Sequence, residues 1–311
     1  MSISLTNENT TASLLERRAF VFTALKAAGV YALLTVPGVS KGHNESTARK
    51  EYTVQDIIDL ILKEIPGAPF KETVDTIKSG SADQKVTGIV TTMFATIEVI
   101  KQAAQLNANF IIVHEPTFYN HADDINWVPG NEVVKKKQEL LSKNNIAIWR
   151  FHDYWHAHRP DGITYGVLKK ANWLEYNSTA EPVFKIPAVT LKEIIHHLKS
   201  SLSIDHLRVI GDLSQSCERI ALLPGAWGGQ RQIALAEKEQ PDVLIVGEVH
   251  EWETAEYIRD ARLLGSKTSL IILGHSVSEE PGMEYLVEWL QAKVPQIKIT
   301  HIASKSPFTL V

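Results

Sequence analysis

Cysteine is almost absent from this chain of 311 residues, since Cys217 is the only one. A single cysteine excludes a disulfide framework and a zinc site built from several thiolates. We expect Cys217 to be a buried thiol that packs like a small hydrophobic residue. A metal site in this protein would therefore use imidazole and carboxylate ligands.

The chain also lacks a surplus of basic residues and a long apolar run. It has 32 Lys and Arg against 36 Asp and Glu, a net charge of -4. This balance argues against a nucleic-acid partner. No stretch offers the roughly 20 apolar residues of a stable membrane span. The 44% of hydrophobic residues suffices for a large core in one large domain or two lobes.

The first 47 residues differ from the rest of the chain. Arg17-Arg18 is followed by Phe20, by a weakly apolar segment containing Lys26, and by Pro37-Gly38. The segment resembles a twin-arginine export signal, although Glu16 stands where Ser or Thr is usual and no clean A-x-A cleavage site follows. It predicts export to the periplasm or the cell exterior. The alternative is an amphipathic N-terminal helix on a cytoplasmic protein.

Helical and strand patterns alternate from residue 52 onward, which predicts the α/β class. The predicted helices cover 54–65, 95–106, 132–143, 191–202, 230–238 and 253–264, and the predicted strands cover 85–93, 110–113, 146–151, 219–223, 243–246 and 270–273. The lysines at 135–137 are expected on a solvated face. A polar break with Pro182 and Pro187 separates the halves. A last helix should begin at Ser278 as N-cap, with Glu279, Glu280 and Pro281 in its first turn.

Histidines and carboxylates follow four of these strands. The four exits read VHEP at 113–116, FHDYWH at 151–156, GEVHE at 247–251 and GHSVSE at 274–279. A single histidine is more often a structural core residue, but strand ends of open α/β sheets meet at one crevice. More than four candidate ligands favour two divalent transition-metal ions (Zn, Fe, Mn, Co or Ni) over one.

A glycine-rich turn, PGAWGG at 224–229, lies between a predicted strand and a predicted helix. Such a turn can hold an anion on backbone N–H groups. Its spacing matches neither of the common phosphate-binding motifs. A tight structural turn is an equally good interpretation.

The order and spacing of the ligand blocks resemble the Nif-three-like (NGG-one-interacting-factor) family. These proteins are also called dinuclear metal-centre hexameric proteins or GTP cyclohydrolase I type 2 homologues. The resemblance covers about Tyr52 to Leu290 and rests on four blocks: 113–116, the His152 to His158 segment, Gly247-Glu248-Val249, and Gly274-His275 with Glu279 and Gly282. It implies two α/β lobes with two metals in the cleft between them, in a homo-hexamer. The compact spacing leaves no room for the inserted domain of many members.

Two positions depart from the family pattern. His114-Glu115 stands where His-His is usual, and His156 stands where Asp is usual. The resemblance thus implies the metal ligands His114, Glu115, His156, His275 and Glu279. One imidazole and one carboxylate have exchanged places, so the charge of the ligand set is preserved, which favours a retained, rearranged site.

The expected domains are 1–47 as signal and linker, 48–178 as the first lobe and 179–311 as the second, with the C-terminal residues free to return to the first. The expected activity is metal-dependent hydrolysis of a small molecule through metal-activated water, with a nucleotide-like substrate implied by the family label. Glu248 and His152 are the candidates for proton transfer. The alternative is a non-catalytic oligomer that stores or delivers metal. His158 and His250 are expected to support the ligands or to contact the substrate, and His121 has no assigned role.

Overall fold

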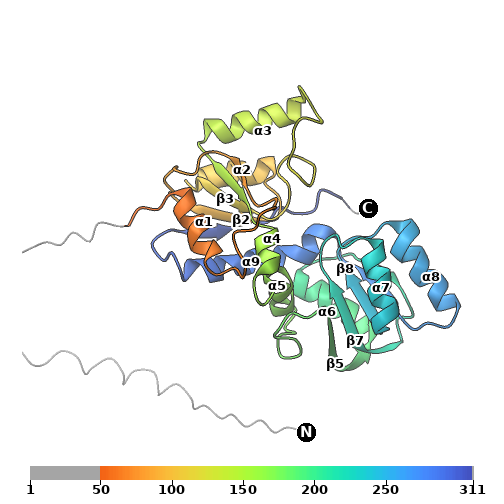
Figure 1. Ribbon diagram of the computed structural model, residues 1–311. Coiled ribbons are helices and arrows are strands. Elements are labelled where there is room, and N and C mark those ends of the chain that lie inside the picture. Colours follow the sequence, from red (N-terminus) through yellow and green to blue (C-terminus); the bar gives the residue numbers. More distant parts are fainter. Residues whose placement is uncertain (1–49, 310–311) are drawn as a thin grey trace, which may run out of the picture. The chain divides into compact units, whose positions relative to one another are not determined.

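The computed structural model of the protein describes residues 50–309 (Figure 1). The predicted export segment lies outside these residues. Among residues 50–309, no helix is long and apolar enough to cross a membrane. Two five-stranded sheets form the framework of this part of the chain. The structure is thus of the predicted α/β class.

The first sheet has the strand order β1-β4-β3-β2-β10. Its strands are β1 (Ile77–Ser79), β2 (Ile89–Thr92), β3 (Phe110–Val113), β4 (Ala147–Arg150) and β10 (Ile299–His301). The last four are parallel, and β1 pairs antiparallel with β4 at the edge. The C-terminal strand β10 therefore lies beside β2, some 200 residues earlier in the sequence.

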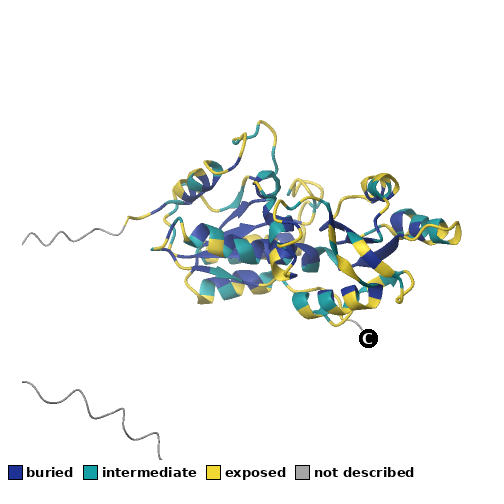
Figure 2. Cartoon of the chain, turned by 90° about the horizontal axis from the view of Figure 1, so that it is seen from below, coloured by how far each residue is buried: buried dark blue, intermediate teal, exposed yellow. Residues whose placement is uncertain are grey.

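Helices cover both faces of this sheet because its strands are apolar on both sides. The helices are α1 (Val54–Leu62), α2 (Ile97–Gln105), α3 (Glu132–Lys143) and α9 (His275–Gln291). Along β3, Phe110 and Ile112 share a core with α1 and α9, whereas Ile111 and Val113 share a core with α2 and α3. Figure 2 shows the buried strands between helices whose outer sides are exposed.

The second sheet has the order β5-β7-β8-β9-β6, with antiparallel strands at both edges. Its strands are β5 (Val183–Thr190), β6 (Arg208–Ile210), β7 (Ser216–Leu223), β8 (Val243–Val246) and β9 (Ser269–Ile272). The helices α5 (Gly162–Lys170) and α6 (Leu191–Leu202) share a core with one face, and α7 (Gly229–Glu239) and α8 (Glu256–Leu263) share a core with the other. Cys217 is buried in this sheet as predicted, and burial raises the pKa of its thiol to about 11.

Helices α5 and α9 pack directly against each other where the two halves of the structure meet. A Cβ atom added to Gly282 would lie 2.6 Å from the Cα atom of Ile163, so the backbones touch. Helix α9 follows a strand of the second sheet, yet Met283 and Leu286 belong to a core of the first. This helix therefore ties the two sheets together.

Several elements differ from the prediction. The strand expected over 85–93 is limited to β2, and the helix expected from Glu253 is a π-helical turn (Glu251–Ala255) followed by α8. The supposed polar break around Pro187 contains β5, an edge strand with an irregular register near this proline. Proline is tolerated at sheet edges because its missing N–H faces no partner there. Also unpredicted were β1, β6, β10, α5 and the short helix α4 (Asp153–Ala157).

The start of the last helix was predicted wrongly. Helix α9 begins at His275 after Gly274, and Pro281 lies inside it. Ser278 is not an N-cap, because its hydroxyl donates to the carbonyl of His275 and accepts from the N–H of Gly225. His275 and Glu279 are therefore one turn apart on the same helix face.

The solvated face expected for the lysines of α3 was also wrong at one position. Lys135 and Lys136 are exposed, but Lys137 is buried with Val134 and Leu141. The spacing of these three residues is that of the inward face of a helix.

Candidate metal centre

The carboxyl ends of β3 and β4 carry the first half of the predicted ligand set. His114 and Glu115 follow β3 directly, and the short helix α4 after β4 carries His156, with His152 just before it. Because the two strands are parallel neighbours, these side chains emerge at the same edge of the sheet. The rings of His114 and His152 are stacked with their centroids 4.7 Å apart.

The first turn of α9 brings the other half. His275 Nε2 lies 3.1 Å from Glu279 Oε2 and 3.2 Å from Glu115 Oε1, and His114 Nε2 lies 3.7 Å from the same oxygen of Glu279. Residues from both sheets therefore meet at one place. The five predicted metal ligands are brought together, with His152 beside them.

Two overlapping groups have the spacing of metal ligands. The donor atoms of His114, His152 and His156 lie within 4.8 Å of one another, as do those of His114, Glu115 and Glu279. His114 belongs to both groups, but its Nδ1 contacts the carbonyl of Phe151 at 3.1 Å. Only its Nε2 is available, so it can bind one ion at a time.

Each of the four imidazoles is oriented through Nδ1. In His114 this atom contacts the carbonyl of Phe151, as described above. In the other three it contacts a carboxylate: His152 Nδ1 lies 2.9 Å from Asp153, His156 Nδ1 lies 2.8 Å from Asp161, and His275 Nδ1 lies 3.3 Å from Glu248. Metal-binding histidines usually use one nitrogen in this way, which fixes the ring and leaves Nε2 for the metal. Asp161 and Asp153 were not assigned any role from the sequence.

Buried polar atoms without hydrogen-bond partners mark the centre. His114 Nε2, His275 Nε2 and Glu279 Oε2 are all buried and unsatisfied. The carboxylate oxygens near His275 Nε2 are close, but neither is aligned as a hydrogen bond. Buried polar atoms are rarely left unpaired in proteins. A cation between these atoms would satisfy all three, so the residues fit a metal ion.

The electrostatic field of the centre also favours a cation. Burial alone would lower the pKa of His275, but Glu115, Glu248 and Glu279 outweigh it and raise the pKa to about 12. For His156, the Asp161 carboxylate outweighs burial and raises the pKa to about 9. Burial, with His152 and His156 nearby, holds the pKa of His114 well below its ordinary value, so this imidazole is neutral and able to bind metal.

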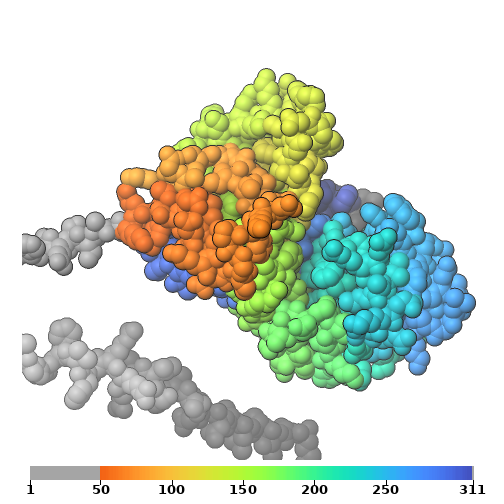
Figure 3. Space-filling view, viewed as in Figure 1, coloured from red at the N-terminus to blue at the C-terminus, as the bar shows by residue number. Residues whose placement is uncertain are grey.

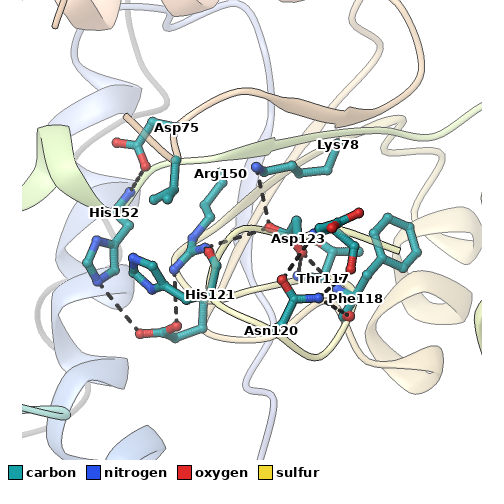
Figure 4. Close-up of polar contacts among 12 residues, drawn as sticks. Asp75, Lys78, Thr117, Phe118, Asn120, His121, Asp123, Arg150 and His152 are labelled. Atoms are coloured by element: carbon teal, nitrogen blue, oxygen red, sulfur yellow. Dashed lines mark hydrogen bonds and ion pairs between the residues drawn. The ribbon is translucent and has the colours of Figure 1, made fainter. Parts of the chain in front are cut away.

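A buried arginine holds Glu115 in place. Arg150, at the end of β4, is fully buried and its Nη2 lies 3.4 Å from Glu115 Oε2. The same guanidinium donates to the carbonyl oxygens of His114 and His121 and lies 3.7 Å from Asp123 (Figure 4). Arg150 is the counter-ion of the Glu115 carboxylate. No pattern in the sequence indicated this contact.

The remaining histidines near strand exits have other roles. His158 is buried with its Nδ1 2.7 Å from the carbonyl of Pro160, and it packs against Trp155 and Trp289. His250 is exposed and stacks on Trp252. Neither is grouped with the candidate ligands. His121 lines the cavity beside the centre, with its ring 5.9 Å from that of His152.

The glycine-rich turn at 224–229 has a structural role. The N–H of Gly225 donates to Ser278, and the N–H of Gly229 donates to Glu253 at 3.1 Å. A Cβ atom at Gly225 would collide with the carboxylate of Glu279. The turn therefore forms the wall against which this candidate ligand packs, which agrees with the interpretation as a tight turn.

An open cavity of about 1230 Å³ lies against the centre. Its lining includes the candidate ligands Glu115, His156, His275 and Glu279 together with His152. Aromatic residues (Phe94, Tyr119, Trp227) and cationic residues (Lys137, Arg231, Lys305) make up other parts of the wall. A molecule of considerable size can therefore reach the centre.

The α/β fold and the imidazole–carboxylate centre together identify the chain as a candidate metal-binding protein. The chain belongs to the Duf34/NIF3 (NGG1p interacting factor 3) family, which it matches over residues 52–307. The predicted family is thereby confirmed.

Relatives named GTP cyclohydrolase 1 type 2 homolog occur in Clostridium perfringens (26% identical, covering 73% of this chain and 87% of the relative) and Clostridium acetobutylicum (25%, 79% and 92%). The fold is similar to that of the crystal structure of a Bacillus cereus protein related to NIF3. That similarity has a TM-score of 0.67 at 18% identity and covers 84% of this chain and all of the other.

Proposed function

We propose that the protein is a metal-dependent hydrolase that binds two divalent transition-metal ions and acts on a small molecule. The observation that carries this proposal is the set of unsatisfied buried atoms of His114, His275 and Glu279 at an open cavity. A protein that only stores metal would enclose its ions, whereas this centre is open to a ligand. The names of the curated relatives favour a nucleotide-like substrate.

The proposed ligands are His114, Glu115, His156, His275 and Glu279. Glu115 and Glu279 each have an oxygen close to His275 Nε2, so these three residues could hold an ion together. Bound divalent ions would supply Lewis acidity and would lower the pKa of a water molecule.

Proton transfer falls to two other residues in this proposal. His152 lines the cavity and is oriented by Asp153, as a proton carrier would be. Glu248 holds Nδ1 of His275, and its side chain is 53% exposed, so it can exchange protons with solvent. Neither residue belongs to the proposed ligand set.

Metal analysis followed by a substrate panel tests this function. The wild-type protein, expressed with ample metal, should contain about two transition-metal ions per chain. His275→Ala and Glu279→Ala should each lose at least one ion. Phosphoester, amide and nucleotide substrates would then identify the reaction. Wild-type protein without bound metal would contradict the proposal.

We also propose the family's hexameric assembly and export by the twin-arginine route. Large exposed apolar side chains near α8, namely Trp252, Leu263 and Leu264, support an assembly surface. Light scattering on the purified protein tests the assembly. For export, the support is the Arg17-Arg18 segment and the start of the family match at residue 52, downstream of it.

A further inference from the structure

The ammonium group of Lys137 is buried without a counter-ion. The residue is only 3% exposed on the inward face of α3. Its Nζ donates to the carbonyl oxygen of Thr117 at 2.6 Å and lies 5.0 Å from the centre of the Tyr119 ring. No carboxylate of residues 50–309 lies within 4.0 Å of its Nζ, and Asp123 acts on it only from farther away, whereas its neighbour Lys136 pairs with Glu132. A buried charge without a counter-ion is costly even when it is hydrogen-bonded, and proteins seldom keep one without a use for it.

Lys137 faces the same cavity as the candidate metal centre. Arg231 and Lys305 also line this cavity; both are exposed, and neither forms an ion pair with any residue that the structure describes. The cavity wall thus combines an acidic, imidazole-rich part with three unpaired cations. This arrangement suits a ligand that carries several negative charges.

The loop from Pro116 to Asp123 presents the partners of Lys137 in a fixed position. The Asp123 carboxylate accepts hydrogen bonds from the N–H groups of Thr117 (2.6 Å) and Phe118 (2.8 Å), and Lys78 lies 3.5 Å from it (Figure 4). This loop and α3 belong to the yellow and yellow-green part of the surface in Figure 3. The site is therefore preorganised, which lowers the cost of binding a ligand.

We propose that Lys137 binds a phosphate group of the substrate. The inference rests on the proposed function, because it places the anion in the cavity of the metal centre. An ammonium has three donors, and Thr117 uses one, so two remain for a ligand. A carboxylate carries a single charge, whereas a phosphate better offsets three cations around one cavity. Metal ions in the centre would add positive charge, so phosphate should bind more tightly to the metal-loaded protein.

Calorimetric titration with inorganic phosphate tests this inference. Lys137→Met keeps most of the buried methylene chain and removes the charge. It should weaken phosphate binding by about 10- to 100-fold, the range for a hydrogen bond to a charged group. Lys136→Met, an exposed change on the same helix, should leave the Kd unchanged. Lys137→Arg should retain part of the affinity because it keeps the charge. Metal content and unfolding midpoint are measured for every variant.

Three outcomes separate the alternatives. A wild-type Kd in metal-loaded Lys137→Met would overturn the inference and would make Lys137 a tether for the Thr117 loop. Acetate that binds the wild type as tightly as phosphate does would overturn the assignment to phosphate. Wild-type protein without metal would contradict the proposed function, whereas the Lys137 comparison can still be made on the metal-free protein.

Discussion

The imidazoles of the centre act through the groups that hold them. Their Nδ1 atoms are occupied by a backbone carbonyl or by a carboxylate, so each ring offers one defined nitrogen. These contacts do not distinguish a metal ligand from a proton carrier, because a carboxylate holds His152 and His156 in the same way. The role of His152 therefore has to be tested by substitution.

His152→Ala should leave two metal ions bound and should lower hydrolysis by about 10²- to 10⁴-fold, the usual contribution of a general acid or base. The reason is that five other residues already provide the proposed ligand set. Elemental analysis and kcat of the same preparation give both readouts. Loss of one ion in this variant would instead make His152 a ligand, in keeping with its spacing from His114 and His156.

The exchanged ligands, Glu115 and His156, should depend on each other. Glu115→His raises the charge of the site by one and leaves Arg150 with Asp123 as its remaining carboxylate. His156→Asp lowers the charge by one and places a second carboxylate beside Asp161. Each single change should reduce metal occupancy. The double variant restores the total charge, so its loss of metal occupancy should be smaller than the sum of the two single losses. Strictly additive losses would show that the two residues do not share a metal centre.

Among the helices and strands, those with a strong local hydrophobic pattern were predicted correctly. The helices α1, α3 and α6 and the buried strands β3 and β8 were found because each has a strong helical or apolar pattern over its full length. The short edge strands β1 and β6 were missed, since their residues are only partly buried. Strand β10 forms by pairing with β2, and no local pattern signals a partner that far away.

The candidate site shows the same division. The convergence of His114, Glu115 and His156 could be predicted because they follow the parallel neighbours β3 and β4. His275 and Glu279 follow β9 of the other sheet, and only the family resemblance joined them to this set. The roles of Arg150 and Asp161 could not be predicted, since they depend on tertiary contacts. Lys137 is an intermediate case. The spacing of Val134, Lys137 and Leu141 placed it on the inward face of α3, but the surrounding lysines concealed this signal.

The contact between α5 and α9 should control both stability and metal binding. In Gly282→Ala the new Cβ would lie 2.6 Å from the backbone of Ile163, and overpacking of this kind costs about 1–3 kcal/mol. The shift of α9 would also move His275 and Glu279. We expect a lower free energy of unfolding in denaturant and weaker metal binding by competition with a chelator. Gly130→Ala strains a backbone with φ of +73° but has no atom within 4 Å of the new Cβ, so it should leave metal binding unchanged. Wild-type metal affinity in Gly282→Ala would show that the helix contact does not position the ligands.

At the scale of the whole molecule, the centre exists only in the folded chain. Its candidate ligands lie between residues 114 and 279 and come from both sheets. An unfolded chain would therefore have no preformed site, and metal binding would be coupled to folding. The twin-arginine route carries folded proteins, so the centre could receive its metal before export. The proposed Arg17-Arg18 signal and a centre of this kind are thus physically compatible.

Replacing both arginines by lysine (Arg17→Lys with Arg18→Lys) should block export by the twin-arginine route. The full-length, metal-loaded precursor should then accumulate inside the cell, because the candidate ligands all lie between residues 114 and 279. The wild-type protein should be found outside the cytoplasm, with its mature N-terminus between Pro37 and Tyr52. Cell fractionation, N-terminal sequencing and metal analysis measure the three results. Wild-type protein in the cytoplasm with its first 36 residues intact would contradict export, and the segment would then have a structural or assembly role.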